Sequence, residues 1–521
     1  MTNKPLSRDW FLSDTAILLS LALLNVIIHL PFVQAYGYFR DELYYIACSD
    51  HLAWGYVDQP PLSIFILAGA QFLFGDSLLA IRIVPILAGA AIVALTGFMA
   101  RQLGGGRLAQ VIAALAALTA PVILGNAGRY FSMNAFDLLF WALASSIAIL
   151  ILRGSAQQLW LLFGAVAGLG TMNKYSMGLF VIGLLIGMLL TPHRKQFLST
   201  WFWFGGALGA LIVVPHVLWQ IANGFPTREF MSNATGLKNV AMGPWEFFVG
   251  QIGMEGVGNL VIWLSGLAFF LFSRPGRTFR PFGIAYVVIF ILLLIQNGKT
   301  YYLSPAYAIL FAGGACGIES LARRAAFGWL KPGTFALIAV GAVVFTPYAI
   351  PVLPVETFVK YQELTGIKPS QEERSRVGVL PQYYADMFGW PEMVDTVARV
   401  YAGLPRQDQE QCMIYVRNYG EAAAIDFFGK RFGLPGAACT HNSYWFWKPR
   451  PWNGEVCIIF GASNDTSECY GDLRQFFEDV RLAAMTDCAY AMPYESRRPI
   501  FICRRAKITL DQIWERDRHF I

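Results

Sequence analysis

The stretch SLLAIRIVPILAGAAIVALTGFMA, residues 77–100, decides the fold class of this chain. Its 24 residues contain a single charged side chain, Arg82. A helix needs roughly 20 mostly apolar residues to cross the hydrocarbon core of a bilayer, so this stretch predicts a membrane-spanning helix.

Similar apolar runs recur on both sides of this stretch. The candidate spans are 13–34, 77–100, 108–125, 134–152, 158–173, 175–191, 201–222, 257–273, 282–297, 302–322 and 333–353. The sequence therefore predicts a polytopic α-helical membrane protein with about eleven spans. The first run follows Lys4 and Arg8 without a small-residue cleavage pattern, so we expect a retained anchor rather than a cleaved signal peptide.

The composition divides the chain into two parts. Hydrophobic residues make up 56% and charged residues 14%, and the mean hydropathy is +0.47. Soluble proteins have about 45–50% apolar and about 25% charged residues, so a disordered chain and an ordinary soluble enzyme are excluded. Residues 1–353 hold 32 charged side chains and residues 354–521 hold 42. We expect a membrane domain over 1–353 and a soluble domain over 354–521.

The positive charges favour one orientation in the membrane. With the N-terminus in the cytoplasm, thirteen Lys and Arg residues of the first 353 fall inside and six fall outside, with Arg82 near a span. An odd number of spans then exports the C-terminal domain. The net charge of +6 does not indicate nucleic-acid binding, because these cations lie in short loops between apolar runs.

The C-terminal domain alternates short β-rich runs with helical patterns. Strands are expected over 412–419, 456–461 and 500–504, and helices over 420–432 and 473–485, which together predict a small α/β domain.

Two features of this domain leave alternatives open. Six of the eight cysteines lie in it, and on an oxidising face they form either disulfides or free buried thiols. The aromatic and basic stretch 440–451 is expected to be a loop that contacts a sugar or lipid headgroup, or that packs the domain on the membrane.

The first exported loop, residues 36–62, carries the sequence YGYFRDELYYIACSDHLAWGYVDQPPL. At 27 residues it is longer than a simple connector, and loops of that length are usually functional or disordered. It contains the adjacent acids Asp41 and Glu42, and Asp58 precedes a Pro-Pro pair. A carboxylate at the membrane surface can accept a proton from an attacking hydroxyl. The alternative is a solvated acidic loop.

Two later clusters place charges at the ends of spans. In GRYFSMNAFD (128–137), Arg129 and Asp137 would share one face if the helix is continuous, either for function or as a structural ion pair. In NKYS (173–176), Lys174 either reaches an anion at the outer surface or snorkels from a helix end.

A third cluster, NGKTYYLSPAY (297–307), opens a late span with Lys299, Tyr301 and Tyr302. Lys and Tyr donors around a lipid phosphate would stabilise a phosphate leaving group. The alternative is a plain aromatic and basic belt at the interface.

Several motifs of other enzymes are missing from the sequence. There is no GxxxxGK[ST], no HExxH, no GxSxG and no DxD, the pair expected where a soluble transferase holds a metal-bound nucleotide sugar. The histidines lack metal-ligand spacing, so we predict no structural metal and no firm cofactor, while a divalent ion bridging Asp41 or Asp58 to phosphate stays open. The pairs Gly164/Gly168 and Gly205/Gly209 predict helix packing.

The order of these motifs resembles a known family. An N-terminal span, an exported loop with Asp-Glu and Pro-Pro-Leu, then RYFSMNAFD, NKYS and KTYYLSPAY are similar to polyprenyl-phosphate-sugar glycosyltransferases of the family 39 type. That clan contains protein O-mannosyltransferases and the lipid A aminoarabinose transferase, all with the GT-C membrane fold. The resemblance is strongest over residues 36–180, and YVRNYGEAAAIDFFGKRFGLP (415–435) also looks like bacterial members.

The resemblance implies roles for individual residues. The family's catalytic acidic pair falls on Asp41 and Glu42, with Asp41 as the base and Asp58 as a second carboxylate of the loop. The resemblance implies that Arg129, Lys174 and Tyr302 hold the lipid phosphate. The residue pattern adds Lys299 and Tyr301 to this role, and Arg40, Gln59 and Asp137 are expected as supporting residues. Gln59 departs from the family, which often has His or Lys before the Pro-Pro, so phosphate stabilisation must rely on other side chains.

The expected function is therefore a glycosyltransferase of the bacterial inner membrane acting on the periplasmic face. It would move a sugar from a polyprenyl-phosphate donor to an envelope glycolipid such as lipopolysaccharide, by one inverting displacement. The alternatives are a protein O-glycosyltransferase, a multispan transporter or a scaffold without activity. If the chain is this enzyme, we expect the acids of the first loop and the bases of later crossings to form one pocket, open to lipid on one side and to water on the other. Membrane lipids are expected partners and nucleic acids are not.

Overall fold

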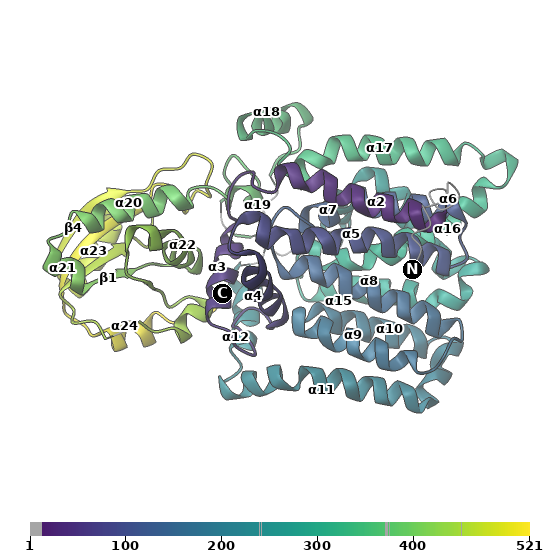
Figure 1. Cartoon of the computed structure of the whole chain (residues 1–521), viewed down its shortest axis with the longest axis horizontal. Helices are drawn as coiled ribbons and strands as arrows, with labels where there is room; N and C mark the ends of the chain where they lie inside the picture. Colours follow the sequence, from purple (N-terminus) through teal and green to yellow (C-terminus); the bar gives the residue numbers. More distant parts are fainter. Residues whose placement is uncertain (1–12, 239, 241, 370–372, 375, 450) are drawn as a thin grey trace, which may run out of the picture. The chain divides into compact units, whose positions relative to one another are not determined.

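The chain forms two compact units in a computed structural model that describes residues 13–238, 240, 242–369, 373–374, 376–449 and 451–521 (Figure 1). The first unit, called the membrane unit here, comprises Met1–Ala35, Phe74–Leu218 and Ala241–Pro354. The second comprises Tyr36–Leu73, Trp219–Val240 and Val355–Ile521 and is called the exported unit here, after the location that the sequence predicts for most of it. Lys4 and Arg8 lie outside the described residues.

All secondary-structure elements of the membrane unit are helices among its described residues. Its first half contains α2 (Asp14–His29), η1 (Leu30–Phe32), α5 (Leu78–Gln102), α6 (Arg107–Thr119), α7 (Pro121–Asn126), α8 (Met133–Leu152), α9 (Leu159–Asn173), α10 (Ser176–Leu189), η2 (Pro192–Leu198) and most of α11 (Thr200–Ala222). Its second half contains α13 (Pro244–Glu255), η4 (Val257–Asn259), α14 (Leu260–Phe272), η5 (Pro275–Phe279), α15 (Arg280–Ile295), η6 (Thr300–Ala306), α16 (Tyr307–Ala322), η7 (Ala325–Phe327) and α17 (Leu330–Ala349).

The helices confirm a multi-pass membrane protein, with fewer full-length spans than expected. Among the described residues, seven helices are long and apolar enough to cross a membrane, or up to nine if each of two bent pairs counts as one span. Two expected spans, 108–125 and 158–173, correspond to the shorter apolar helices Arg107–Thr119 and Leu159–Asn173. A run of apolar residues indicates burial away from water, but a bend or an early helix end depends on packing.

Glycines let the helices of the membrane unit approach closely, as the small-residue pairs predict. A Cβ added to Gly164 of α9 would lie 1.9 Å from the carbonyl oxygen of Gly205 in α11. A Cβ on Gly168 would lie 2.8 Å from the carbonyl oxygen of Gly209. Since real Cβ atoms do not approach this closely, only glycine permits this crossing, and backbone contact replaces side-chain packing.

The exported unit combines helices with one small sheet. Its helices are α3 (Arg40–Asp50), most of α4 (Leu62–Phe74), α12 (Pro226–Asn233), α18 (Val355–Thr365), α19 (Gln382–Ala385), α20 (Trp390–Ala402), α21 (Arg406–Gln411), α22 (Tyr419–Phe428), α23 (Thr466–Phe476) and α24 (Leu510–Arg516), with shorter turns η3 (Ala234–Lys238), η8 (Gly429–Phe432) and η9 (Asn442–Phe446). Its strands are β1 (Cys412–Tyr415), β2 (Ala437–Ala438), β3 (Val456–Phe460), β4 (Phe477–Met485) and β5 (Pro499–Ala506).

The five strands form a mixed sheet in the order β2-β1-β3-β5-β4. β1 pairs in parallel with β2 and β3, while β5 pairs antiparallel with β3 and β4. One face packs on α23 and α24, where Cys457 and Trp514 join the same core. Alternate residues such as Ile458 are fully buried as well. Burial on both faces explains the near-continuous apolar strands, and the expected α/β domain is confirmed.

One helix expected in this unit is wrong. Residues 473–485 were expected to be helical, but α23 ends at Phe476 and Phe477–Met485 forms strand β4. The two buried residues of β4, Phe477 and Val480, are three apart, a spacing that also fits one face of a helix. Pairing with β5 therefore outweighs the local helical pattern.

All eight cysteines are free thiols in this structure, so the free-thiol alternative describes the exported unit here.

Candidate active site

The acidic pair of the first loop lies at the start of helix α3. Phe39 is the N-cap, and its backbone N–H donates to Oε2 of Glu42 at 2.9 Å. Glu42 is fully buried. A carboxylate three residues after the N-cap satisfies an amide that has no partner within the helix and suits the positive end of the helix dipole. Glu42 therefore has a structural reason to be present.

Asp41 differs from its neighbour because its side chain remains accessible. About 35% of this side chain is exposed. Its Oδ1 accepts a hydrogen bond from the Tyr419 hydroxyl at 2.9 Å and lies 3.7 Å from Nε of Arg40. Asp41 is thus a fixed carboxylate with room for a further hydrogen-bond donor.

Arg40 anchors this cluster to the rest of the exported unit. Its guanidinium lies 3.7 Å from the carboxylate of Asp386, donates to the Tyr494 hydroxyl at 2.5 Å and covers the ring of Tyr419 at 5.2 Å. Burial raises the pKa of Asp386 to about 6, and the charge of Arg40 limits that rise. The arginine holds both tyrosines and therefore supports Asp41 indirectly.

Asp58 lies in the same unit and receives a different support. The Tyr44 hydroxyl donates to Oδ1 of Asp58 at 2.9 Å, and the same hydroxyl accepts from the backbone N–H of Ser443 at 3.2 Å. Burial raises the pKa of Asp58 to about 6, the Tyr44 hydrogen bond opposes this, and the charge of Asp41 adds to it. Asp58 therefore changes its charge close to neutral pH.

Gln59 is fully buried beside Asp58. Its carbonyl oxygen accepts from the backbone N–H of Tyr56 at 3.1 Å. Its side-chain amide has no hydrogen-bond partner among the residues that the structure describes. Glutamine is neutral, so it brings no positive charge to the position where the resembled family often has His or Lys.

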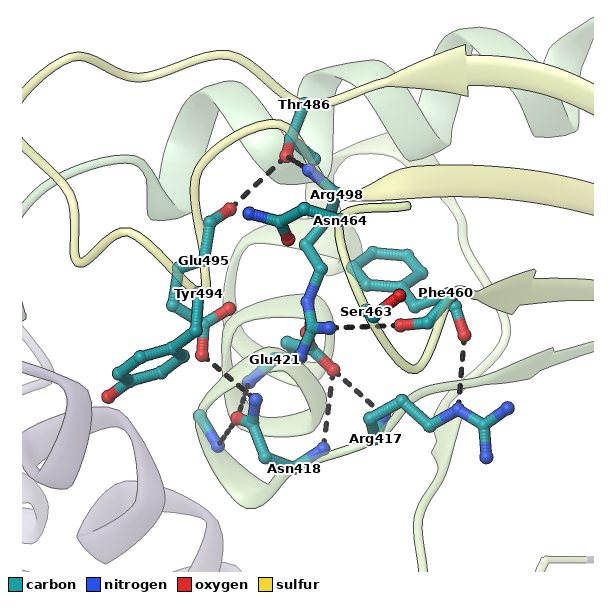
Figure 2. A network of polar contacts seen from close by, with 12 residues as sticks. Arg417, Asn418, Glu421, Phe460, Ser463, Asn464, Thr486, Tyr494, Glu495 and Arg498 are labelled. Carbon is teal, nitrogen blue, oxygen red and sulfur yellow. Dashed lines mark hydrogen bonds and ion pairs between the residues drawn. The ribbon is translucent and has the colours of Figure 1, made fainter. Parts of the chain in front are cut away.

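A polar network that includes Asn418, Glu421 and Glu495 lies next to Tyr494 (Figure 2). Asn418 caps α22 and donates to Glu495 at 2.9 Å, and the buried Glu421 lies 3.3 Å from Nε of Arg498. Since Asn418 precedes Tyr419 and Glu495 follows Tyr494, these bonds position both tyrosines. The segment 415–435 thus supports the carboxylates, a role that sequence reasoning did not assign to it.

Gly420 allows Arg40 to pack against α22, which gives a stability prediction. A Cβ at this position would lie 2.5 Å from Cγ of Arg40. We expect Gly420→Ala to destabilise the protein by about 1–3 kcal/mol through overpacking, measured as a lower melting temperature. The control is Gly471→Ala in α23, where no atom lies within 4 Å of the added Cβ. There we expect no loss and a gain of up to ~1 kcal/mol. Equal effects at the two sites would contradict the packing argument.

The exported unit also contains a pocket of about 290 Å³ next to this cluster. Arg40 and Tyr419 form part of its wall and are also in contact with Asp41. The pocket is lined by Arg40, Leu237, Lys238, Glu373, Arg374, Asn418, Tyr419, His441, Tyr494 and Ile521.

The membrane unit holds a second, basic cluster around Lys174. This residue is the C-cap that follows α9, and its Nζ donates to the side-chain oxygen of Asn134 at 2.7 Å. The same atom lies 3.6 Å from the buried carboxylate of Asp137, which also accepts from the Ser176 hydroxyl at 2.6 Å. A charge inside a membrane protein needs such partners, because an isolated one is costly.

The two tyrosines of the late span complete this cluster. Nζ of Lys174 lies 5.1 Å and 5.2 Å from the ring centroids of Tyr301 and Tyr302, both in η6. Lys299 is the half-buried N-cap of the same short helix. Three segments far apart in sequence therefore bring together Asp137, Lys174 and the Tyr301–Tyr302 pair.

Arg129 is placed differently from the expectation. Helix α8 begins at Met133, after Arg129. Arg129 and Asp137 therefore do not lie on one continuous helix, and the expectation that they share a helix face is wrong. The Arg129 guanidinium instead donates to the carbonyl oxygen of Ala349 at 3.1 Å and to the Tyr130 hydroxyl at 3.2 Å. The carboxylate of Asp137 pairs instead with Lys174, a residue that the sequence placed at a helix end but did not connect with Asp137.

Some residues of the site have weak or no sequence signals. Asp386, Tyr494 and His441 come from the exported unit, hundreds of residues after the acidic loop, and no spacing rule connects them with it. Among the described residues, no group of three or more His, Cys, Asp or Glu side chains could hold a metal ion.

A family model and a curated relative each match part of the chain. Residues 58–219 match the family model described as dolichyl-phosphate-mannose-protein mannosyltransferase. Over 271 residues the chain is 25% identical to undecaprenyl phosphate-alpha-4-amino-4-deoxy-L-arabinose arabinosyl transferase 2 of Pseudomonas fluorescens (strain Pf0-1). That alignment covers 48% of this chain and 47% of the relative, so the chain spans about half the length of this curated relative.

The solved structures extend the likeness in fold to nearly the whole chain. ArnT from Cupriavidus metallidurans in the apo state has a TM-score of 0.55 at 14% identity, covering 94% of this chain and 97% of that one. The same enzyme bound to undecaprenyl phosphate gives 0.56 at 14% identity, covering 95% and 98%. The oligosaccharyltransferase of Archaeoglobus fulgidus gives 0.52 at 13% identity, covering 88% and 70%.

The fold is therefore that of the GT-C membrane glycosyltransferases. Together with the match over residues 58–219 and the curated relative, this fold supports the resemblance to glycosyltransferases of the protein mannosyltransferase and ArnT type seen in the sequence.

Proposed function

We propose that the chain transfers a sugar from a polyprenyl-phosphate donor to a hydroxyl group of an envelope glycolipid. The accessible carboxylate of Asp41, fixed by the Tyr419 hydroxyl at 2.9 Å, is the observation that carries this proposal. Undecaprenyl phosphate is the donor lipid that we infer, because the name of the Pseudomonas fluorescens relative and the ligand of the ArnT structure both contain it.

The proposed reaction is a single displacement. Asp41 accepts the proton of the acceptor hydroxyl while the hydroxyl oxygen bonds to the anomeric carbon. The bond from that carbon to the phosphate oxygen breaks, the anomeric centre inverts, and the polyprenyl phosphate leaves with the bonding electron pair. Asp58, in its charged form, orients the acceptor hydroxyl.

The leaving phosphate gains negative charge, and we assign its stabilisation to the basic cluster of the membrane unit. Lys174 supplies a positive charge, and Tyr301 and Tyr302 supply hydroxyl donors. Lys299 and Arg129 add positive charge in the same role. This assignment is supported by the packing of Lys174 on both tyrosine rings, which fixes its ammonium group.

We also propose the site of action. The counts of basic residues favour a cytoplasmic N-terminus and an exported unit in the periplasm of a bacterial inner membrane. A lipid donor remains in the bilayer while its sugar reaches the surface, which suits a reaction at a junction of loop and span. Lipopolysaccharide is the acceptor we favour. A protein acceptor is the second candidate, because the matching family model is described as a protein mannosyltransferase.

A transfer assay in proteoliposomes tests this function. The purified full chain is incubated with an undecaprenyl-phosphate-linked radiolabelled sugar and either lipid A or a membrane protein extract. We expect label in the glycolipid together with released undecaprenyl phosphate. Label that crosses the bilayer without forming a covalent product would indicate a transporter and contradict the proposal. Mass spectrometry of glycolipids and glycoproteins from a deletion strain identifies the natural acceptor.

The pKa of Asp58 gives a prediction for the pH dependence. With a pKa of about 6, Asp58 is protonated below that pH and charged above it, so kcat/KM should rise as the pH increases through about 6. The Tyr44 hydrogen bond lowers this pKa. Tyr44→Phe should therefore raise it and move the acid limb of the profile to higher pH.

The control for this pH shift is Tyr401→Phe. The half-buried Tyr401 donates from its hydroxyl to the backbone carbonyl of Gln409, so this variant removes a hydrogen-bonded hydroxyl without changing the surroundings of Asp58. The acid limb should stay in place in this variant. An unmoved limb in Tyr44→Phe would remove Asp58 from the ionisations that control the rate.

A further inference from the structure

The pocket of about 290 Å³ in the exported unit has a lining that the proposed displacement does not fully use. Only two of its wall residues, Arg40 and Tyr419, contact Asp41. A volume of this size is at the lower end of small-molecule sites, which hold a few polar groups in fixed positions.

The lining of the pocket is predominantly positive. It contains Arg40, Lys238 and Arg374 against one acidic side chain, Glu373. Nζ of Lys238 lies 3.7 Å from Glu373, while the backbone N–H of Arg374 donates to the carbonyl oxygen of Lys238 at 3.0 Å. The segments 237–238 and 373–374 are therefore tied together. Arg40 is paired with Asp41 and Asp386, and Lys238 with Glu373, so the exposed Arg374 is the cation of the wall that best suits an anionic ligand.

His441 adds a hydrogen-bond acceptor to the same wall. Its Nε2 is 2.9 Å from the carbonyl oxygen of Ile521, which can only accept, so the proton of the ring lies on Nε2. Nδ1 is buried and has no hydrogen-bond partner among the described residues, and the whole residue is 8% exposed. Burial holds the pKa of His441 well below its ordinary value. Nδ1 is therefore a bare acceptor that requires a donor such as a hydroxyl group.

Two tyrosines, Tyr419 and Tyr494, add aromatic surface to the wall. The ring of Tyr419 lies 4.9 Å from that of His441 and 4.6 Å from that of Tyr44. Tyr494 receives the hydrogen bond of Arg40, and the network of Figure 2 fixes the backbone next to both tyrosines. Rings of this kind offer apolar surface together with a polar edge.

We propose that this pocket is the subsite for an anionic sugar of the acceptor, an inference that rests on the proposed function. The phosphate or carboxylate of the sugar would pair with Arg374 and Lys238, and a sugar hydroxyl would donate to Nδ1 of His441. The apolar face of the sugar ring would contact Tyr419. Because the Tyr419 hydroxyl also donates to Asp41, a sugar bound here lies one side chain away from the proposed base.

Ligand binding to the full chain in detergent micelles tests this subsite without requiring transfer. The probes are glucose 6-phosphate and glucuronate as anionic sugars, with glucose and inorganic phosphate as partial ligands, measured by saturation-transfer NMR and titration. We expect both anionic sugars to bind at least tenfold more tightly than either partial ligand. Inorganic phosphate binding as tightly as the sugars would indicate a simple anion site and overturn the proposal.

Two variants and one control locate the binding. Arg374→Ala removes an exposed cation, and His441→Phe removes the Nδ1 acceptor but keeps a ring, so each should weaken binding of glucose 6-phosphate about tenfold. Arg505→Ala breaks an exposed ion pair with Glu478 outside the pocket and should leave binding unchanged. Because Arg374 is exposed, its variant stays informative even if His441→Phe does not fold. Unchanged affinity in Arg374→Ala would overturn the proposal.

The binding experiment and the transfer assay test the subsite and the proposed reaction independently. Transfer by a chain that binds no anionic sugar would remove the subsite and leave the proposed function intact. Binding by a chain that transfers nothing would remove the proposed reaction and leave a sugar-binding pocket.

Discussion

Asp41→Asn is expected to lower the rate of sugar transfer by about 100- to 10,000-fold, the range that a positioned general base contributes. Asparagine has nearly the same shape and can still accept the hydrogen bond from Tyr419, but its amide cannot take the proton of the acceptor hydroxyl. The melting temperature should therefore change little while the rate falls. The measurement is the initial rate of transfer in proteoliposomes with a matched amount of folded protein.

The neighbouring acid provides the matched control. Glu42→Gln keeps an oxygen that can accept from the Phe39 N–H, because glutamine serves as well as glutamate three residues after an N-cap. We expect this variant to fold and to retain most of its activity. If Glu42→Gln loses as much activity as Asp41→Asn, the two acids act as a catalytic pair, and the assignment of Glu42 to the helix cap is wrong.

Lys174→Met is expected to reduce both stability and donor binding. The side chains of Lys174 and Asp137 are 11% and 2% exposed, so removal of the cation leaves a buried carboxylate without its counter-charge. Breaking a buried pair in this way costs about 3–5 kcal/mol. In addition, the lost positive charge should raise the KM for the lipid-linked donor, measured in the same transfer assay.

A second substitution separates these two effects. In the double variant Lys174→Met/Asp137→Asn the unpaired charge is gone, so most of the melting temperature should return, while the KM for the donor should stay high. Asp137→Asn alone keeps the lysine and should retain donor binding. A double variant that recovers both stability and KM would show that Lys174 has a purely structural role.

The acidic loop shows how much of the site could be read from the sequence. The stretch 36–62 pointed to Asp41, Glu42 and Asp58, and the structure places all three in the exported unit, with Glu42 buried as a helix cap and Asp41 accessible. The identity of adjacent acids cannot distinguish these roles, because the side of a helix that is buried depends on what packs against it. Here α22 packs against α3.

The side chains that contact the first loop could not be predicted from the sequence. Tyr419 and Asp386 reach the first loop from positions more than 300 residues later, and hydrogen bonds of this separation leave no local pattern. The same holds for Lys174, whose contact with Asp137 was missed because a helix break moved Arg129 off the expected face.

The sequence by itself indicated the membrane class, a small α/β part near the C-terminal end and the resemblance to the glycosyltransferases, because apolar length, charge density and motif order are properties of local stretches. The tertiary structure alone decided that residues 477–485 form a strand, that two expected spans are short helices, and which acid stays accessible. Each of these outcomes depends on a partner far away in the chain, whose burial and hydrogen bonds outweigh the local preference.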